Sequence, residues 1–317
     1  GSEENQLSRI LKCCIALLAV ILLCAESYAM EIQDYSEDIA WEKNGERVVF
    51  QQKRGFWSYE GKGLSVEIQR FRDAKKFLIY YVADIKFKED HRMKSFFADP
   101  EKVGRAFLPV EQMARNNKLV LAINDDMVGY RIYRQRTVGH VVRDGKVISN
   151  ESYKKETPVL PNLDTMTFEK DGTMKVFSAL EHTAEDFVKM GYRDVFSFGP
   201  YIIQNSKMNP LIEKRYDRPE ARTVIGMVNK NHYVVFTCEG RRPEVSIGTT
   251  LKWVAELLLK KGVTTAFNFD GGGSTALVFM GIRLDSYNPK GHIRSGRKLS
   301  GILGIGRSDL VPRWEKK

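Results

Sequence analysis

The sequence predicts an α+β fold: a single strand-rich domain with a mixed sheet and a few packed helices. From about Val48 onward, apolar residues mostly alternate with polar ones or form short runs, which is typical of β-strands. Apolar residues at helical spacing occur in few segments. No internal repeat, low-complexity tract or proline-rich linker divides this part, and the chain's hydrophobic content of 43% is enough for a sizeable core.

The first segment has the layout of a secretory signal peptide. Arg9 and Lys12 precede the apolar run "CCIALLAVILLCA", and small residues follow at Ser27 and Ala29. The run is shorter than the roughly 20 residues that span a bilayer. A signal peptide over residues 1–29 is therefore favoured, and an uncleaved N-terminal anchor is the alternative.

This leader divides the chain into three predicted parts. Residues 1–29 are the signal peptide or anchor, residues 30–47 a polar lead-in, and residues 48–317 the folded domain. A secretory signal predicts a secreted protein or one of the cell envelope, in the periplasm or at the cell surface. Contact with a membrane is expected only through an uncleaved N-terminal segment, and no oligomeric state is predicted.

The charge and the cysteines narrow the function classes. The net charge is +10, but acidic residues interleave with the basic ones, as in "KKFLIYYVADIKFKED". A solvated surface that attracts anionic polymers or substrates is therefore favoured, and nucleic acid is not predicted as a partner. Cys238 is the one cysteine beyond the leader, and its apolar run "HYVVFTC" predicts a small buried side chain.

Strands and hairpins account for most of the predicted domain. Strands are predicted over residues 64–71, 76–87 and 118–124. Turn residues between apolar runs predict three hairpins, at Asp144–Gly145, Asp171–Gly172 and Asn229–Asn231.

Three segments are predicted to be helical. A proline at an early helical position begins residues 109–117. Thr183 is predicted to cap a helix that ends near Gly191. Residues 249–262 carry an apolar face, a capping threonine at the start, two lysines near the end and a final glycine.

The segment "FNFDGGGSTALVF" places Asp270, three glycines, Ser274 and Thr275 between two apolar strands. Glycines beside strands cost conformational entropy, so a tight turn or a close approach of the backbone to a ligand is expected. The Walker pattern and the dinucleotide fingerprint both fail, because no Gly-Lys-Ser/Thr and no helix follow. On spacing alone, a hairpin turn and an anion-binding loop are equally favoured.

This segment resembles the signature of the phosphodiester glycosidase family. Residues 268–275, "NFDGGGST", differ from the family's "NLDGGGST" only at Phe269. Further segments resemble family motifs in the family's order: "DVFSFGPYIIQ", "EARTVIGMV", "TCEGRRPEV" and "RKLSGILGIG". The resemblance covers roughly residues 118–306, and the family includes the mannose-6-phosphate uncovering enzyme and many exported bacterial proteins.

The resemblance implies hydrolysis of a sugar-1-phosphodiester, a reaction in which glycosidases generally use a pair of carboxylates. We take Asp270 and Asp126 as the hypothetical catalytic pair, with Asp125 and Glu239 as further candidates. Arginines can meet the phosphodiester charge with bidentate hydrogen bonds. The implied substrate-binding residues are Asn124, Arg222, Glu239, Arg241, Gly271, Gly272, Gly273, Ser274, Thr275 and Arg297.

No organic cofactor is required for this reaction, and no metal ligands are assigned. Carboxylates beside a phosphodiester can recruit a divalent cation, so a cation at Asp270 or its neighbours is a second option. The five histidines show no metal-binding spacing. Trp57 is left open as a side chain that stacks on a sugar.

Three departures from the family pattern lie where a substrate would bind. Asp125 replaces a glycine, Met127–Val128 replace an aromatic pair, and Glu239 replaces an aspartate. The favoured function is an exported glycosidase that hydrolyses a sugar-1-phosphodiester or a related cell-envelope or exopolysaccharide glycan. The departures support an alternative, a non-catalytic glycan-binding or envelope assembly protein that retains the family pocket.

Overall fold

The computed structural model describes residues 38–88, 90–126, 139–151, 163–285 and 296–315. The predicted signal peptide, residues 1–29, and the substituted pair Met127–Val128 lie outside the described residues.

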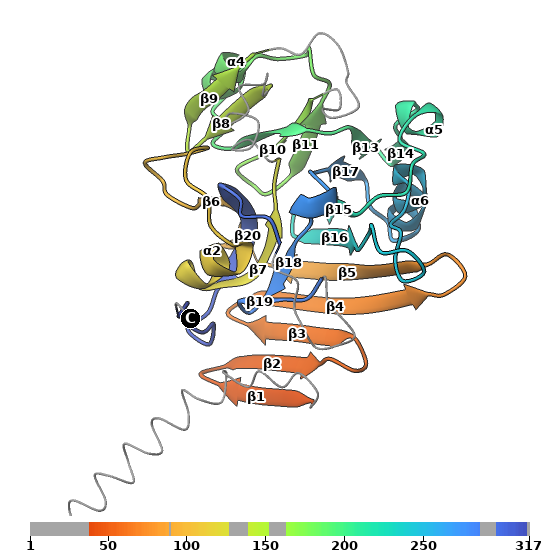
Figure 1. Cartoon of the computed structure of the whole chain (residues 1–317). Coiled ribbons are helices and arrows are strands. Elements are labelled where there is room, and N and C mark those ends of the chain that lie inside the picture. Colours follow the sequence, from red (N-terminus) through yellow and green to blue (C-terminus); the bar gives the residue numbers. More distant parts are fainter. Residues whose placement is uncertain (1–37, 89, 127–138, 152–162, 286–295, 316–317) are drawn as a thin grey trace, which may run out of the picture. The chain divides into compact units, whose positions relative to one another are not determined.

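Ten strands form one large sheet in the order β1-β2-β3-β4-β5-β16-β15-β17-β13-β14 (Figure 1). Their bounds are β1 Ile39–Lys43, β2 Glu46–Gln51, β3 Phe56–Gly61, β4 Leu64–Asp73, β5 Leu78–Phe87, β13 Tyr201–Gln204, β14 Lys207–Met208, β15 Arg222–Asn229, β16 His232–Cys238 and β17 Thr265–Asn268. The N-terminal strands thus pair with the C-terminal half of the chain through β5 and β16.

Two sheets of five strands complete the described β-structure. The β8 sheet has the order β11-β10-β12-β8-β9, with β8 His140–Arg143, β9 Lys146–Asn150, β10 Asp164–Phe168, β11 Met174–Phe177 and β12 Val195–Phe198. The β7 sheet has the order β19-β18-β7-β20-β6, with β6 Lys94–Phe97, β7 Leu119–Asn124, β18 Leu277–Phe279, β19 Ile282–Arg283 and β20 Gly301–Arg307.

The described fold is strand-rich with few helices, as predicted, but its sheets are not mixed. Each strand pair between described residues is antiparallel. Many neighbours in the sheets are joined by short hairpin connections, whereas parallel pairs need long crossovers. The three predicted hairpins are confirmed by the pairing of β8 with β9, β10 with β11 and β15 with β16.

Strand structure begins at Ile39, inside the range 30–47 where the sequence predicts a polar lead-in. The first hairpin turns at Asn44 and Gly45, with φ of 53° and 75°. Two successive positive φ values fit a type I′ turn, for which Asn-Gly is the preferred pair. The Asn44-Gly45 pair is therefore a local sequence signal for this hairpin that the sequence analysis missed.

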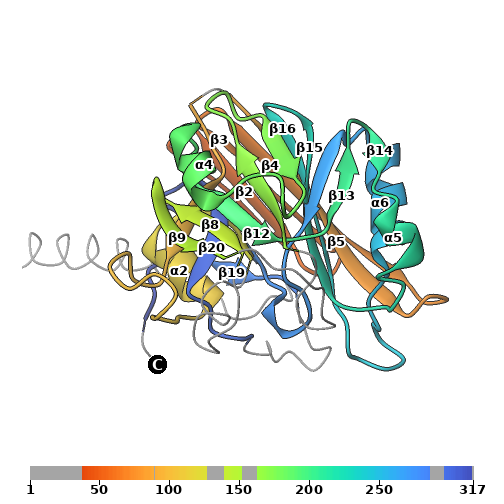
Figure 2. The same cartoon turned by 90° about the horizontal axis from the view of Figure 1, so that it is seen from above.

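The predicted helices are confirmed as α2 (Val110–Asn116), α4 (Ala184–Lys189) and α6 (Leu251–Lys260), and a short α5 (Leu211–Lys214) was not predicted. Thr183 caps α4 with a reciprocal capping box, and Thr250 caps α6. The apolar face of α6 packs on one face of the large sheet, against Val224 of β15, Phe236 of β16 and Ala266 of β17 (Figure 2).

The other face of the large sheet shares a core with the β7 sheet, since Ile85 and Ile225 cluster with Ile123 and Leu277. Trp57 belongs to this core and is 0% exposed, so the option that it stacks on a sugar at the surface is wrong.

The glycine segment lies where the chain passes from one sheet to another. β17 belongs to the large sheet and β18 to the β7 sheet, and the short 3-10 turn Gly272–Ser274 lies between them (Figure 1). The alternative of a hairpin turn is therefore wrong, because the two strands do not pair with each other.

Candidate functional site

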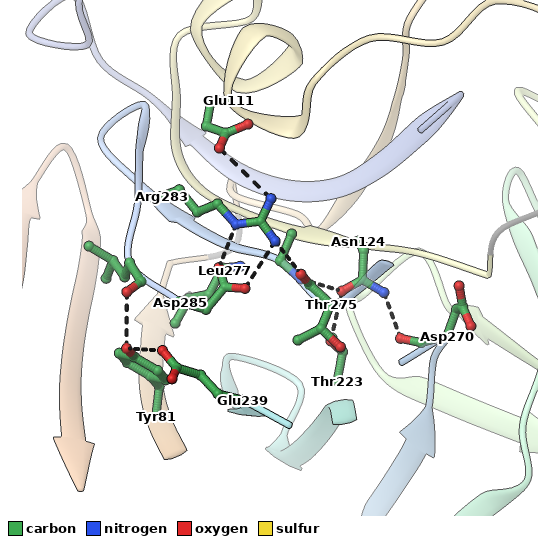
Figure 3. Close-up of polar contacts among 12 residues, drawn as sticks. Tyr81, Glu111, Asn124, Thr223, Glu239, Asp270, Thr275, Leu277, Arg283 and Asp285 are labelled. Carbon is green, nitrogen blue, oxygen red and sulfur yellow. Dashed lines mark hydrogen bonds and ion pairs between the residues drawn. The ribbon is translucent and has the colours of Figure 1, made fainter. Parts of the chain in front are cut away.

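Asn124, the last residue of β7, holds both ends of the glycine turn (Figure 3). Its Nδ2 donates to the carbonyl oxygen of Asp270 at 2.7 Å, and its Oδ1 accepts from the backbone N–H of Ala276 at 3.1 Å. The same Oδ1 accepts from the Thr223 hydroxyl of β15 at 2.7 Å. Asn124 is fully buried. Through these hydrogen bonds, the predicted substrate-binding residue links the β7 sheet to the large sheet.

The fold itself requires glycine at two positions of the turn, Gly271 and Gly272. A Cβ at residue 271 would lie 2.2 Å from the carbonyl oxygen of Ala221, far inside van der Waals contact. Gly272 has a φ of +56°, which side chains rarely tolerate. The N–H groups of Gly272, Ser274 and Thr275 already donate to carbonyl oxygens of the chain. The turn therefore offers fewer backbone donors to an anion than three successive glycines suggest.

Two predicted arginines lie against the turn. A guanidinium nitrogen of Arg241 is 2.5 Å from the position of a Cβ at Gly272, and one of Arg297 is 3.3 Å from the position at Gly273. Arg241 and Arg297 are both exposed. Arg297 Nη1 also donates to the Ser274 hydroxyl at 2.9 Å. The structure thus places two cations beside the glycines that follow the half-buried Asp270.

Arg241 is oriented by Glu220, which the sequence analysis did not single out. Arg241 Nε lies 3.1 Å from Glu220 Oε1, and Nη2 lies 3.1 Å from Glu220 Oε2. Glu220 precedes Ala221, whose carbonyl oxygen accepts from the N–H of Gly272 at 3.0 Å. One short segment therefore positions both the arginine and the turn.

Asp126, the predicted partner of Asp270, is fully buried and bound to the protein on both oxygens. Oδ1 accepts from Arg143 Nη2 at 2.7 Å, and Oδ2 accepts from the N–H of Ser197 at 2.9 Å. Asp125 is also buried and lies 3.8 Å from the same Arg143 nitrogen. Burial lowers the pKa of Arg143, and Asp126 and Asp125 more than offset it, so the net pKa is raised.

Glu239 is buried and bound by two neighbours. Its Oε1 accepts from the Tyr81 hydroxyl at 3.1 Å, and its other oxygen pairs with Arg242. The Tyr81 hydroxyl also lies 3.0 Å from the carbonyl oxygen of Leu284 (Figure 3). Burial, followed by the charge of Glu239, raises the pKa of Tyr81 well above its ordinary value, so Tyr81 stays a neutral donor.

The guanidinium of Arg222 is bound to two backbone carbonyl oxygens. Its Nε donates to the carbonyl oxygen of Thr249 at 3.1 Å, and Nη2 donates to that of Arg218 at 2.8 Å. The next residue of β15, Thr223, contacts Asn124, and successive strand residues face opposite sides of a sheet. Burial lowers the pKa of Arg222.

The sequence analysis missed an ion pair that binds the residues leaving the turn. Arg283 and Asp285 are 6% and 1% exposed and lie at and after β19. Arg283 Nε lies 3.1 Å from Asp285 Oδ1, and Nη2 lies 3.1 Å from Oδ2. Arg143 and Glu220 were missed as well. Arg143 and Glu220 meet partners 17 and 21 residues away in the sequence, and nothing local indicates those partners. Arg283 and Asp285 are only two residues apart, but they lie outside the motifs that the sequence analysis used.

Two features are absent from the described residues. No group of three or more His, Cys, Asp or Glu side chains in the described ranges could hold a metal ion. Among the residues that the structure describes, no helix is long and apolar enough to cross a membrane.

Comparison with known proteins finds a family match over the site. The family model for phosphodiester glycosidases matches residues 117–305. The uncharacterized SPbeta prophage-derived protein YomE of Bacillus subtilis strain 168 is 30% identical over 171 residues, 52% of this chain and 25% of its own length. Human N-acetylglucosamine-1-phosphodiester alpha-N-acetylglucosaminidase is 43% identical over 97 residues, 29% of this chain and 18% of its own length. The chain therefore spans a quarter or less of these two relatives.

A solved structure has a similar fold. It is the catalytic domain of zebrafish N-acetylglucosamine-1-phosphodiester alpha-N-acetylglucosaminidase, auto-inhibited by its pro-peptide. The TM-score is 0.58 at 19% identity, over 89% of this chain and 93% of the zebrafish chain.

Proposed function

Because this chain belongs to the phosphodiester glycosidase family, we propose that it is an exported hydrolase that cleaves a sugar-1-phosphodiester of the cell envelope or an exopolysaccharide. The observation that carries the proposal is the placement of Arg241 and Arg297 against Gly272 and Gly273, directly after Asp270. The human relative is named for hydrolysis of an N-acetylglucosamine-1-phosphodiester, which supports this substrate class.

The chemistry of a sugar-1-phosphodiester fits these groups. The substrate carries one negative charge on phosphate, and planar guanidinium groups bind such an anion with paired hydrogen bonds. Phosphate is a good leaving group, so stabilising its charge as the bond to the anomeric carbon breaks contributes directly to the rate. Arg297 and the donors of Arg241 that do not face Glu220 would supply that stabilisation, and the Ser274 hydroxyl would orient Arg297.

Asp270 is the carboxylate that we assign to acid, base or nucleophile chemistry. Asp270 is half-buried and lies two residues after the end of β17, and Asn124 and Asp125 hold its backbone. Asp126 is fully buried against Arg143, so we assign it a supporting role at the base of the site. No organic cofactor is needed, and a divalent cation near Asp270 is tested by assaying with added Mg²⁺ and with a chelator.

The test is turnover of N-acetylglucosamine-1-phosphate esterified to 4-methylumbelliferone, with the full chain and Asp270→Asn. Cleavage at the anomeric carbon by the wild type is expected to release N-acetylglucosamine and 4-methylumbelliferyl phosphate, from which added alkaline phosphatase frees the fluorophore. Asp270→Asn is expected to lose about 10²–10⁴-fold in kcat. The control is Asp309→Asn, which removes one partner of the exposed pair Lys118–Asp309. Unchanged turnover in Asp270→Asn would rule out the assigned role.

A second function has one observation in its favour. Asp126 and Glu239, two of the candidate carboxylates, are buried and bound to arginines. A non-catalytic protein that binds a glycan phosphate needs the arginines but no pair of accessible carboxylates. Calorimetric binding of N-acetylglucosamine-1-phosphate without turnover of the fluorogenic ester would favour this second function.

A further inference from the structure

We propose that Arg283 and Asp285 are positioning residues for the glycine turn, a role that rests on the proposed function of that turn. The pair acts through the three residues that leave the turn, Thr275, Ala276 and Leu277. Arg283 Nη2 donates to the carbonyl oxygen of Thr275, and Asp285 Oδ1 accepts from the N–H of Leu277 at 2.8 Å.

Together with Asn124, the pair holds each of these three residues by a polar side chain (Figure 3). Asn124 accepts from the N–H of Ala276, which lies between the residues bound by Arg283 and Asp285. The entry of the turn is held as well, because Asn124 also donates to Asp270. The path of residues 270–277 is thus held by Asn124 at the end of β7 and by the pair at and after β19, two strands of the same sheet.

The orientation of the pair is fixed in turn. Arg283 meets Asp285 through two parallel contacts of 3.1 Å, a bidentate geometry that defines the plane of the guanidinium. A third nitrogen, Nη1, lies 3.8 Å from Glu111 Oε1 in the first turn of α2. Burial lowers the pKa of Arg283, and Asp285 and Glu111 more than offset this, so its net pKa is raised and the cation persists.

Stability alone does not account for such a pair. A buried ion pair generally contributes no more than apolar side chains of the same volume, because both charges lose their hydration. What distinguishes it is directional hydrogen bonding to two backbone groups. At Thr275 the pair binds the backbone carbonyl oxygen. The residue is 5% exposed, and its hydroxyl has no hydrogen bond within the described structure. Thr275 directly follows Ser274, whose hydroxyl accepts from Arg297 Nη1, so the pair holds the chain one residue away from a contact of a proposed anion-binding arginine.

Three variants separate these contacts. Asp285→Ala removes the acceptor of the Leu277 N–H, Asp285→Asn keeps an acceptor but loses the charge, and Arg283→Lys keeps the charge but loses the planar fork. Asp309→Asn, in an exposed ion pair, is the control. Hydrogen exchange of the peptide over 270–277 is expected to speed up about tenfold in Asp285→Ala, and Asp285→Asn is expected to restore protection of Leu277.

Turnover provides the second readout. Below their melting temperatures, Asp285→Ala and Arg283→Lys are expected to lower kcat about 10²-fold with a smaller change in KM, because misplacement by about 1 Å costs that much. The kcat of Asp285→Asn is expected to lie between the kcat values of these two variants and that of the wild type. Exchange at β5 and β16 stays unchanged if the effect is local.

Two results overturn the proposal: wild-type exchange over 270–277 in Asp285→Ala, or wild-type kcat in folded Arg283→Lys. If the wild type itself shows no turnover, the proposed function fails, and the exchange measurement together with calorimetric binding of N-acetylglucosamine-1-phosphate still decides whether the pair positions the turn. Unchanged affinity in a variant with faster exchange would then count against the positioning role.

Discussion

Asn124 and Asp270 are joined by a hydrogen bond of 2.7 Å that links two sheets. Asn124 ends β7 in one sheet, and Asp270 follows β17 in the other. Because Asn124 also binds Ala276 and Thr223, a single amide fixes the strand ends around the candidate catalytic carboxylate.

Replacing Asn124 by Asp should damage both stability and turnover. The new oxygen would face the carbonyl oxygen of Asp270, and the lost donor leaves that carbonyl without its partner. We expect a loss of about 1–3 kcal/mol in the free energy of unfolding, measured by urea denaturation, and reduced kcat. Asn117→Asp is the matched control, since Asn117 Nδ2 also donates to a backbone carbonyl, that of Met113, but at the C-terminal end of α2. Equal effects of both variants would contradict the special role of Asn124.

A methyl group at Gly271 should not fit. The Cβ would meet the carbonyl oxygen of Ala221 at 2.2 Å, and this backbone contact cannot relax as a flexible side chain does. We expect Gly271→Ala to destabilise the protein by about 1–3 kcal/mol, as overpacking generally does. Gly273→Ala is the control, because its nearest neighbour is the end of the Arg297 side chain at 3.3 Å. A thermal melt of both variants measures the difference, and equal melting temperatures would refute it.

Arg143 and Asp126 should depend on each other for stability. Arg143→Met leaves the Asp126 carboxylate buried without its cation, and breaking a buried pair in this way costs about 3–5 kcal/mol. Asp126→Asn should be destabilising in the same direction. Arg193→Met breaks the exposed pair Arg193–Asp144 and should cost about 0–1 kcal/mol. If Asp126→Asn instead melted like the wild type and lost all turnover, Asp126 would be catalytic.

Stability should fall on the alkaline side, in part through Cys238. Burial raises the pKa of its thiol from its ordinary value of about 9 to about 12. The folded state therefore keeps a proton that the unfolded state releases above pH 9, so the free energy of unfolding decreases as pH rises toward 12. Burial raises the pKa of Tyr81 as well, which adds to the fall above pH 10.

Urea unfolding between pH 8 and pH 10.5 measures this dependence. The contribution of Cys238 should reach about 1–2 kcal/mol at the upper end, at about 1.4 kcal/mol per pH unit beyond the unfolded pKa. Cys238→Ala should show a correspondingly shallower decline. An identical slope in the two proteins would mean that the thiol does not titrate differently on unfolding.

Local patterns were enough to predict the elements whose signals are local. The apolar face and the capping threonine predict α6, and the Asp-Gly pairs predict two of the hairpins. The prediction of a mixed sheet was wrong, because the sequence does not show which strands are neighbours. The same limit applies to the glycine turn, whose flanking strands belong to different sheets.

The resemblance to family motifs indicated the arginines that lie beside the glycines, whereas ion pairs outside those motifs were missed. Arg241 and Arg297 do lie beside the glycines. Arg222 faces the carbonyl of Thr249, because strand alternation turns it away from Asn124. Arg143 and Arg283 were missed, since an arginine among apolar residues does not reveal which buried carboxylate it meets.

The pairing of β5 with β16 sets a limit on how this chain can be shortened. β1 to β5, residues 39–87, precede the family-matched segment 117–305, yet β5 covers the whole length of β16 from His232 to Cys238. A fragment cut at residue 117 would expose an apolar strand edge with its row of unpaired N–H and C=O groups. Such an edge is a template for intermolecular β-pairing and aggregation. The smallest soluble fragment of this protein should therefore begin near residue 38 and retain the N-terminal strands.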